Sequence, residues 1–149
     1  MTTDKRKATT STLWASLFKA ASIQSYIRKN DEDLGSPTFA EYISSLCRER
    51  GMVAERVIKR AGVERGFGHQ IFRGVRRPSR DTVIQLAFGF EADVEQAQEL
   101  LRAAGYCDLY PRIKRDAVIC YCLKNGYGII EAQQMLMDLA LPIIGGDRK

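Results

Sequence analysis

The chain has 149 residues, of which 45% are hydrophobic and 28% charged, and it carries a net charge of +5. This composition is typical of a folded globular protein and excludes a disordered chain. No apolar run approaches the roughly 20 residues that a membrane-spanning helix needs, and the first residues lack the apolar stretch of a secretion signal. We therefore expect a cytoplasmic protein that does not contact membranes.

The N-terminal arm, residues 1–37, contains one segment with a helical pattern. Residues 11–29 form an amphipathic stretch whose apolar positions are Leu13, Trp14, Leu17, Phe18, Ala21 and Ile27. The spacing predicts a single helix, followed by a linker over residues 30–37. Trp14 fits either a core or dimer contact, the usual role of a large aromatic side chain, or a stacking platform for nucleic acid.

A compact unit of five helices is predicted over residues 38–106. Its first helix begins at Thr38, which together with Glu41 has the spacing of a capping box. Ser79, after a helix-breaking proline, is suited to cap the fourth helix, and Asp93 the fifth. The apolar positions repeat at helical spacing and are Phe39, Tyr42, Ile43, Leu46, Cys47, Val57, Ile58, Ala61, Ile71, Val83, Leu86, Ala87, Val94, Ala97, Leu100, Leu101 and Ala104.

Glycines separate these segments, and no strand pattern is present. Six of them follow an apolar-periodic segment and are expected to end a helix in the left-handed conformation: Gly51, Gly62, Gly74, Gly89, Gly105 and Gly126. In the C-terminal extension, residues 107–149, we expect helices over residues 113–123 and 129–141, and a tail that frays from Ile143. The predicted fold class is therefore all-α, with helical extensions on both sides of the five-helix unit.

Catalytic and metal-binding motifs are lacking. The four cysteines are not spaced as a zinc-binding set, since Cys120 and Cys122 form a C-x-C pair inside an apolar helical run. We expect all four to be buried, reduced structural residues. With His69 as the single histidine, neither a metal site nor a catalytic triad can be assigned. The chain is predicted to be a non-enzyme without metal or cofactor.

Positive charge is concentrated in one third of the chain. Residues 48–80 contain ten arginine and lysine residues against three glutamates, a local charge of +7, so the rest of the chain carries −2. Such a segment is typical of a surface that binds a polyanion. A solvated helical surface explains the charge equally well, so charge alone leaves both interpretations open.

The run RERGMVAERVIKRAGVERGFGHQIFRGVRRPSRDTVIQLA is similar to the lambda-repressor/Cro-like helix-turn-helix family, also called the xenobiotic-response-element family. It has the family's glycine before the first motif helix, its Ala-Gly-Val turn, its isoleucine on the second helix, and its Arg-Gly and Pro-Ser pairs. These features stand at Gly51, residues 61–63, Ile71, residues 73–74 and residues 78–79. The resemblance implies a lambda-repressor-like fold whose second motif helix enters the DNA major groove.

The resemblance also implies a set of DNA-contacting residues. The family's base-reading positions fall on Arg65, Gly66, His69 and Gln70, and its phosphate-contacting positions on Arg73, Arg76 and Arg77, to which we add Arg80. An arginine can pair with guanine O6 and N7, and a glutamine with adenine N6 and N7. Phosphate contacts fix the register without reading sequence. His69 is either a groove contact or a solvated residue.

Two departures from the family pattern affect this assignment. Ala54 occupies a position where the family often has a phosphate-contacting glutamine, and Gly68 replaces an apolar core residue of the second motif helix. Glycine weakens a helix by about 1 kcal/mol relative to alanine. Either the first turn of that helix is irregular, or Phe67 turns inward to fill the space left at Gly68. The functional interpretation of the same glycines is that Gly66 lets the backbone approach DNA closely.

Two functions follow from these observations. The first is a sequence-specific regulator of transcription, repressor-like, that binds double-stranded DNA as a homodimer through its terminal helices and is nucleoid-associated when bound. The second is a protein-interaction module, an adaptor or inhibitor, that uses the helix-turn-helix scaffold to bind an as yet unidentified protein partner. The two glycines and Ala54 favour the second.

Overall fold

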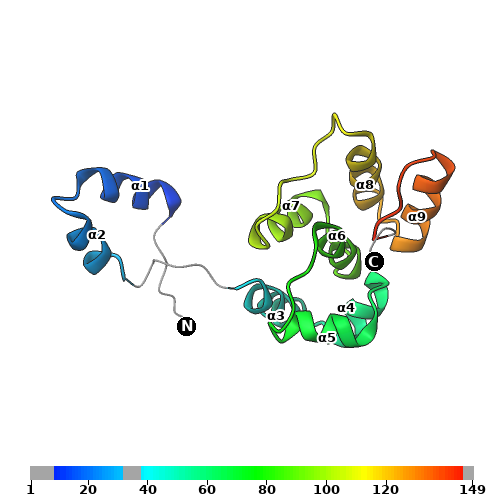
Figure 1. Cartoon of the computed structure of the whole chain (residues 1–149), viewed down its shortest axis with the longest axis horizontal. Coiled ribbons are helices and arrows are strands. Elements are labelled where there is room, and N and C mark those ends of the chain that lie inside the picture. The colour runs from blue at the N-terminus through cyan, green and yellow to red at the C-terminus, as the bar shows by residue number, and fades with distance from the viewer. Residues whose placement is uncertain (1–8, 32–37, 146–149) are drawn as a thin grey trace. The chain divides into compact units, whose positions relative to one another are not determined.

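A computed structural model describes residues 9–31 and 38–145 of the chain. Within these two ranges the regular elements are nine α-helices and no strands (Figure 1). Their bounds are α1 Thr10–Lys19, α2 Ile23–Lys29, α3 Phe39–Arg50, α4 Ala54–Ala61, α5 Arg65–Phe72, α6 Arg80–Gly89, α7 Val94–Ala103, α8 Lys114–Lys124 and α9 Ile129–Asp138. The chain divides into two compact units between residues 36 and 37. None of the nine helices has the length and apolar character needed to cross a membrane.

The N-terminal unit contains two helices where the sequence predicted one. Ala20 ends α1 with extended backbone angles, and the Ser22 hydroxyl accepts a hydrogen bond from the Ser25 backbone N–H at 3.1 Å, which starts α2. Serine hydroxyls compete with the helix for backbone groups, so this cap favours a break. On α1 the rings of Trp14 and Phe18 stack 5.4 Å apart and are both exposed. The predicted linker lies outside the described residues from position 32 to 37.

Helix α6 lies at the centre of the C-terminal unit. Seven of its ten residues are buried, because it is apolar on nearly all sides. It packs against α4 and α7 and also contacts α9. The core positions predicted for the five-helix unit are confirmed: most are buried, while Phe39, Tyr42, Val94 and Ala104 are partly buried and pack at its edge.

Local hydrogen bonds fix the predicted helix starts. Thr38 and Glu41 form both bonds of a capping box, at 3.1 and 2.9 Å. Ser79 accepts a hydrogen bond from the backbone N–H of Thr82, and Asp93 caps α7 in the same way. All three caps are confirmed, since each depends on residues three positions apart.

One of the six predicted helix-ending glycines has a different role. Gly51, Gly62, Gly74, Gly105 and Gly126 all have positive φ as expected. Gly89 instead lies within α6, where a Cβ would collide with the backbone carbonyl of Val57 in α4. The prediction for Gly89 was wrong because the glycine permits close packing of two helices. The chain turns after α6 at Glu91, whose φ is 57°.

The C-terminal extension packs in the same compact unit as α3–α7. Helix α9 ends at Asp138, three residues earlier than predicted, and Ala140 then takes a positive φ of 59°. Residues 143–145 are not frayed. Ile144 is buried, and its backbone exchanges two hydrogen bonds of 2.8 Å with the Gln133 amide. The rest of the predicted frayed tail, residues 146–149, lies outside the described residues.

The four cysteines are all unpaired but differ in exposure. Cys47 and Cys122 are buried and Cys120 is partly buried, and burial raises the pKa of each of these thiols. Cys107 is exposed, so the prediction of four buried cysteines was wrong at this position. It lies in the segment between α7 and α8, which runs over the surface of the unit.

Candidate nucleic-acid interface

Helix α5 begins directly after the predicted turn. Gly62 ends α4 in the left-handed conformation, and Glu64 then caps α5. The Glu64 carboxylate accepts hydrogen bonds from the backbone N–H groups of Phe67 at 2.8 Å and Gly66 at 3.0 Å. These two bonds, with that of Phe67 the stronger influence, hold the pKa of Glu64 below its usual value. Glutamate is not a preferred capping residue, so the sequence pattern did not indicate this cap.

Gly68 allows α5 to pack tightly against α4. The helix runs without a break over its eight residues, so the irregular first turn considered above does not occur. Gly68 is buried, and a Cβ there would stand 2.6 Å from Cγ2 of Ile58. There is consequently no empty space for Phe67 to fill. A larger side chain at position 68 is excluded because Ile58 occupies that volume.

The four predicted base-reading residues lie on one face of α5, since they are spaced i, i+1, i+4 and i+5. Arg65 and Gly66 are exposed, while His69 and Gln70 are partly exposed. A Cβ at Gly66 would meet only the Glu64 carboxylate, at 3.4 Å. The Gln70 side chain makes no hydrogen bond with any of the described residues. This face can therefore accept a ligand along the first two turns of α5.

Glu55 of α4 links two of these residues. Its carboxylate oxygens lie 2.7 Å from Nε2 of His69 and 2.8 Å from Nε of Arg65. The His69 contact first, and the Arg65 contact second, hold the pKa of Glu55 below its usual value. An ionised carboxylate only accepts hydrogen bonds, so Nε2 of His69 carries the proton. The sequence did not identify Glu55 as a site residue, because no local pattern links position 55 to α5.

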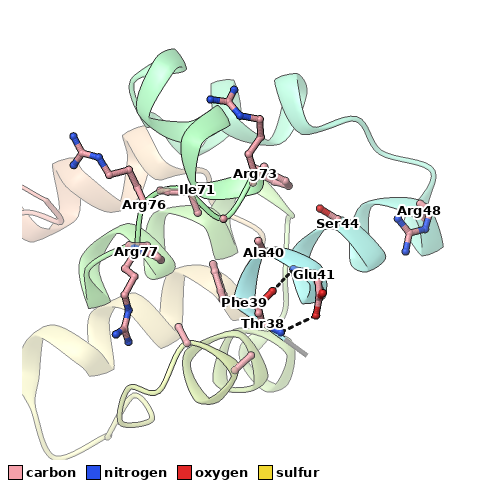
Figure 2. A pocket seen from close by; sticks show the side chains of 15 residues that line it. Thr38, Phe39, Ala40, Glu41, Ser44, Arg48, Ile71, Arg73, Arg76 and Arg77 are labelled. Carbon is pink, nitrogen blue, oxygen red and sulfur yellow. Dashed lines mark hydrogen bonds between the residues drawn. The ribbon is translucent and has the colours of Figure 1, made fainter. Parts of the chain in front are cut away.

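Three arginines follow α5 on the exposed segment that leads to α6. Arg73, Arg76 and Arg77 border an open pocket of about 740 Å³ and extend outward from its rim (Figure 2). The Arg76 guanidinium lies over the Phe67 ring, 5.8 Å from its centroid, which is within cation–π range. The side chains of Arg73 and Arg77 form no ion pair or hydrogen bond with the described part of the chain. They are available to a ligand.

The charge of this pocket favours an anion. Besides the three arginines its wall contains Arg48, and the one acid among its lining residues is Glu41. The Glu41 carboxylate already accepts the hydrogen bond from the backbone N–H of Thr38 that starts α3 (Figure 2). The lining therefore carries four guanidinium groups against a single, engaged carboxylate, and this positive balance favours an anion.

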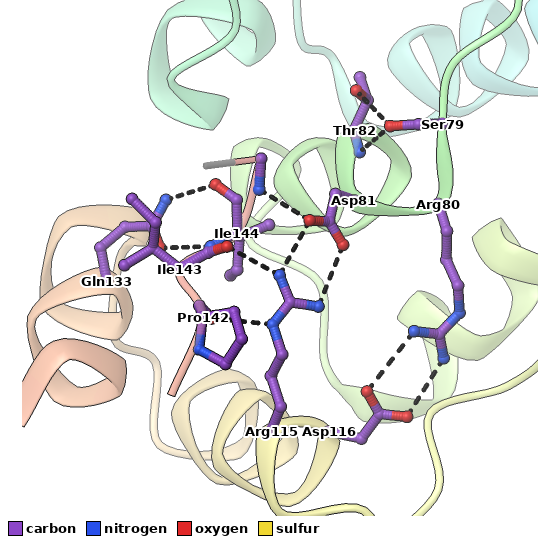
Figure 3. A network of polar contacts seen from close by, with 11 residues as sticks. Ser79, Arg80, Asp81, Thr82, Arg115, Asp116, Gln133, Pro142, Ile143 and Ile144 are labelled. Atoms are coloured by element: carbon purple, nitrogen blue, oxygen red, sulfur yellow. Dashed lines mark hydrogen bonds and ion pairs between the residues drawn. The ribbon is translucent and has the colours of Figure 1, made fainter. Parts of the chain in front are cut away.

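Arg80 is not part of this surface. Its guanidinium forms an ion pair of 3.2 Å with Asp116 of α8 (Figure 3). It also donates to the backbone carbonyls of Asp108 and Cys107. Asp116 is only 2% exposed. The phosphate contact at Arg80 stays a prediction. In the structure this arginine fastens the C-terminal extension to the start of α6.

A second ion pair, next to the first, holds the same two helices. Arg115 of α8 donates to both carboxylate oxygens of Asp81, at 3.1 and 2.8 Å, and to the backbone carbonyls of Pro142 and Ile143 (Figure 3). The backbone N–H of Gly145 completes the contacts of Asp81 at 2.8 Å. Both helices carry an arginine followed by an aspartate at these positions, and the two ion pairs are crossed: Arg80 pairs with Asp116, and Asp81 pairs with Arg115.

Within the described ranges no three His, Cys, Asp or Glu side chains come together as metal ligands would. No family model, curated protein or solved structure matches the chain. The exposed face of α5 offers hydrogen-bond donors and acceptors. Beside it stand Arg73 and Arg77, whose guanidinium groups are unpaired within the described part of the chain.

Proposed function

We propose that the protein is a sequence-specific regulator of transcription that binds double-stranded DNA, with α4 and α5 as a lambda-repressor-like helix-turn-helix. One observation carries the proposal: an exposed helical face with Arg65 and Gln70 lies beside Arg73 and Arg77, whose side chains have no partner among the described residues. Side chains of the first kind read base edges, and those of the second kind bind phosphates.

Substitution of a base-reading residue and substitution of a phosphate-binding residue should change DNA binding in different ways. Gln70 would pair with adenine N6 and N7, so its loss relaxes the preference at one base pair. Arg73, Arg76 and Arg77 would bind phosphates, so the loss of any one weakens binding to every sequence. Arg76 is already held over the Phe67 ring, which fixes one of these contacts relative to α5.

Exposed apolar side chains support a dimeric regulator. On α9, Ile130 and Met137 are exposed at i and i+7 and share a helix face, and on α1 the stacked Trp14 and Phe18 are exposed. Dimers of helix-turn-helix proteins bind half-sites about 34–36 Å apart, one DNA turn. Size-exclusion chromatography with light scattering on wild type and Ile130→Glu would detect the dimer and locate it.

The test is a selection of bound fragments from genomic DNA, followed by affinity measurements on the best duplex across a salt series. We expect Gln70→Ala to reduce the preference for that duplex over a shuffled one. Arg76→Ala should weaken both alike and lower the slope of log K against log salt by about 1. Absence of any preferred fragment, together with a flat salt dependence, would contradict the proposal, since phosphate contacts release counterions.

A second candidate function is supported by acidic residues on the same surface. Glu55 and Glu64 both lie at the first turns of their helices, on the exposed side, and Val53 and Val75 are exposed at the two ends of the motif. A protein partner would tolerate carboxylates and cover valines, so an adaptor or inhibitor function fits these residues. Recovery of one stoichiometric protein partner by a preparation that shifts no DNA would favour this function.

A further inference from the structure

The Glu55 carboxylate uses both of its oxygens on residues of the proposed reading helix. Oε2 accepts from Nε of Arg65 at 2.8 Å, and Oε1 lies 2.7 Å from Nε2 of His69. Arg65 and His69 are four residues apart on α5, so they project from successive turns on one side. A single carboxylate from α4 therefore holds two side chains of the neighbouring helix at once.

The contact leaves the recognition edge of Arg65 open. Glu55 takes only Nε, and the two terminal nitrogens, Nη1 and Nη2, have no hydrogen bond to the described residues. The Arg65 side chain is 75% exposed, and a free arginine of this kind would sample many rotamers. The Glu55 contact at Nε restricts that sampling and leaves both Nη donors free, and these are the two donors that pair with guanine O6 and N7.

Stability does not explain this arrangement. Glu55 is itself about half exposed, and exposed ion pairs contribute little to folding. A carboxylate on a DNA-facing surface also repels phosphates. Its presence between two candidate contacts is therefore better explained by its effect on Arg65 than by its effect on folding.

We propose that Glu55 is a positioning residue that directs Arg65 to a guanine base and away from the phosphate backbone. The inference rests on the proposed function. With Glu55 in place, Arg65 reaches a base edge in a fixed orientation. Without it, Arg65 is free to pair with the nearest phosphate, so affinity for unrelated DNA rises while discrimination falls.

The experiment uses the full chain and a duplex selected by the wild-type protein from a random library. Each guanine of the selected site is replaced in turn by 7-deazaguanine, which lacks the N7 acceptor, and affinities are measured by fluorescence anisotropy. We expect wild type to lose about tenfold in affinity at one guanine, because one of the two hydrogen bonds of the bidentate contact is removed and a whole such contact is worth about 1–3 kcal/mol. Arg65→Ala should show no penalty there, which identifies the base that Arg65 reads.

Two substitutions at position 55 separate geometry from charge. Glu55→Gln keeps the shape but can accept from only one partner, and Glu55→Asp keeps the charge but is one methylene too short to hold both. We expect both variants to lose most of the tenfold penalty and to bind a shuffled duplex at least as tightly as wild type does. Glu95→Gln, which removes the same charge from α7, should behave as wild type.

The possible failures are distinguishable. If wild type selects a site but Glu55→Gln keeps the full 7-deazaguanine penalty, the positioning role is wrong and the proposed function stands. If Glu55→Asp behaves as wild type while Glu55→Gln does not, charge alone matters and the positioning role is also wrong. If wild type selects no site at all, the proposed function fails, and the guanine assignment fails with it.

Discussion

Gly68 in α5 lies so close to Ile58 in α4 that a Cβ at position 68 would stand 2.6 Å from Cγ2 of the isoleucine. Ile58 is buried and β-branched, so it cannot rotate away. Overpacking of this kind costs about 1–3 kcal/mol, against a gain of about 1 kcal/mol in helix propensity. We expect Gly68→Ala to lower the free energy of unfolding by roughly 1 kcal/mol, measured by urea denaturation.

Gly66 provides the matched comparison, two residues earlier in the same helix. A Cβ there meets only the carboxylate of Glu64 at 3.4 Å, and this exposed side chain can shift. Gly66→Ala should therefore raise the free energy of unfolding by about 0.5–1 kcal/mol through helix propensity. Equal effects of the two substitutions would contradict the described packing of α5 on α4.

Arg80 and Arg77 are close in sequence, but we expect their substitution by alanine to have different effects. Loss of Arg80 should lower stability, and loss of Arg77 should weaken DNA binding. Arg80→Ala leaves Asp116 buried without its cation. Breaking a buried pair costs about 3–5 kcal/mol, and the partial exposure of Arg80 reduces this to roughly 2–3 kcal/mol. Arg77→Ala should change stability by less than about 0.5 kcal/mol but lower the salt slope of DNA binding. Urea denaturation and anisotropy on both variants check this; a stable Arg80→Ala protein that binds DNA poorly would restore Arg80 to the contact surface.

Asp81 should make the stability of the folded protein decrease at acidic pH. Burial raises its pKa, but the hydrogen bonds from Arg115 and Gly145 lower it by more, so the folded-state pKa lies below the ordinary value of 3.8. The stabilisation is therefore present above pH 3.8 and is lost as the pH falls through the lower folded value. We expect Asp81→Asn to be less stable than wild type at pH 7, with the difference shrinking below pH 3.8. A difference that stays constant down to pH 2 would show that titration of Asp81 plays no part.

Thiol labelling should distinguish the four cysteines. Cys107 is exposed, whereas burial raises the pKa of Cys47, Cys120 and Cys122 and keeps these thiols protonated. The thiolate is the reactive form, so native protein should react rapidly with one equivalent of a disulfide reagent at pH 8. Cys107→Ser should abolish that fast phase, while urea should release the remaining thiols. A fast phase that survives the substitution would mean that another cysteine is accessible.

Features that depend on neighbours in sequence could be predicted, and those that depend on packing could not. The capping box at Thr38 and the left-handed Gly62 follow from local chemistry. The sequence around Gly89 resembles a helix end, but in the fold this glycine allows α6 to pack closely against α4. Similarly, the face of α5 could be assigned from its spacing, but the role of Glu55 required knowing that α4 brings position 55 beside Arg65.

The paired contacts between α6 and α8 also bear on how the chain folds during its synthesis. A nascent chain that has released only α3–α7 from the ribosome carries Arg80 and Asp81 without Asp116, Arg115 or Gly145. Their charges then stay hydrated at the start of the central helix until roughly 13 to 42 more residues, at about 5–20 per second, have emerged. Helices α3–α7, although already translated, therefore wait up to several seconds for the contacts that fasten α6.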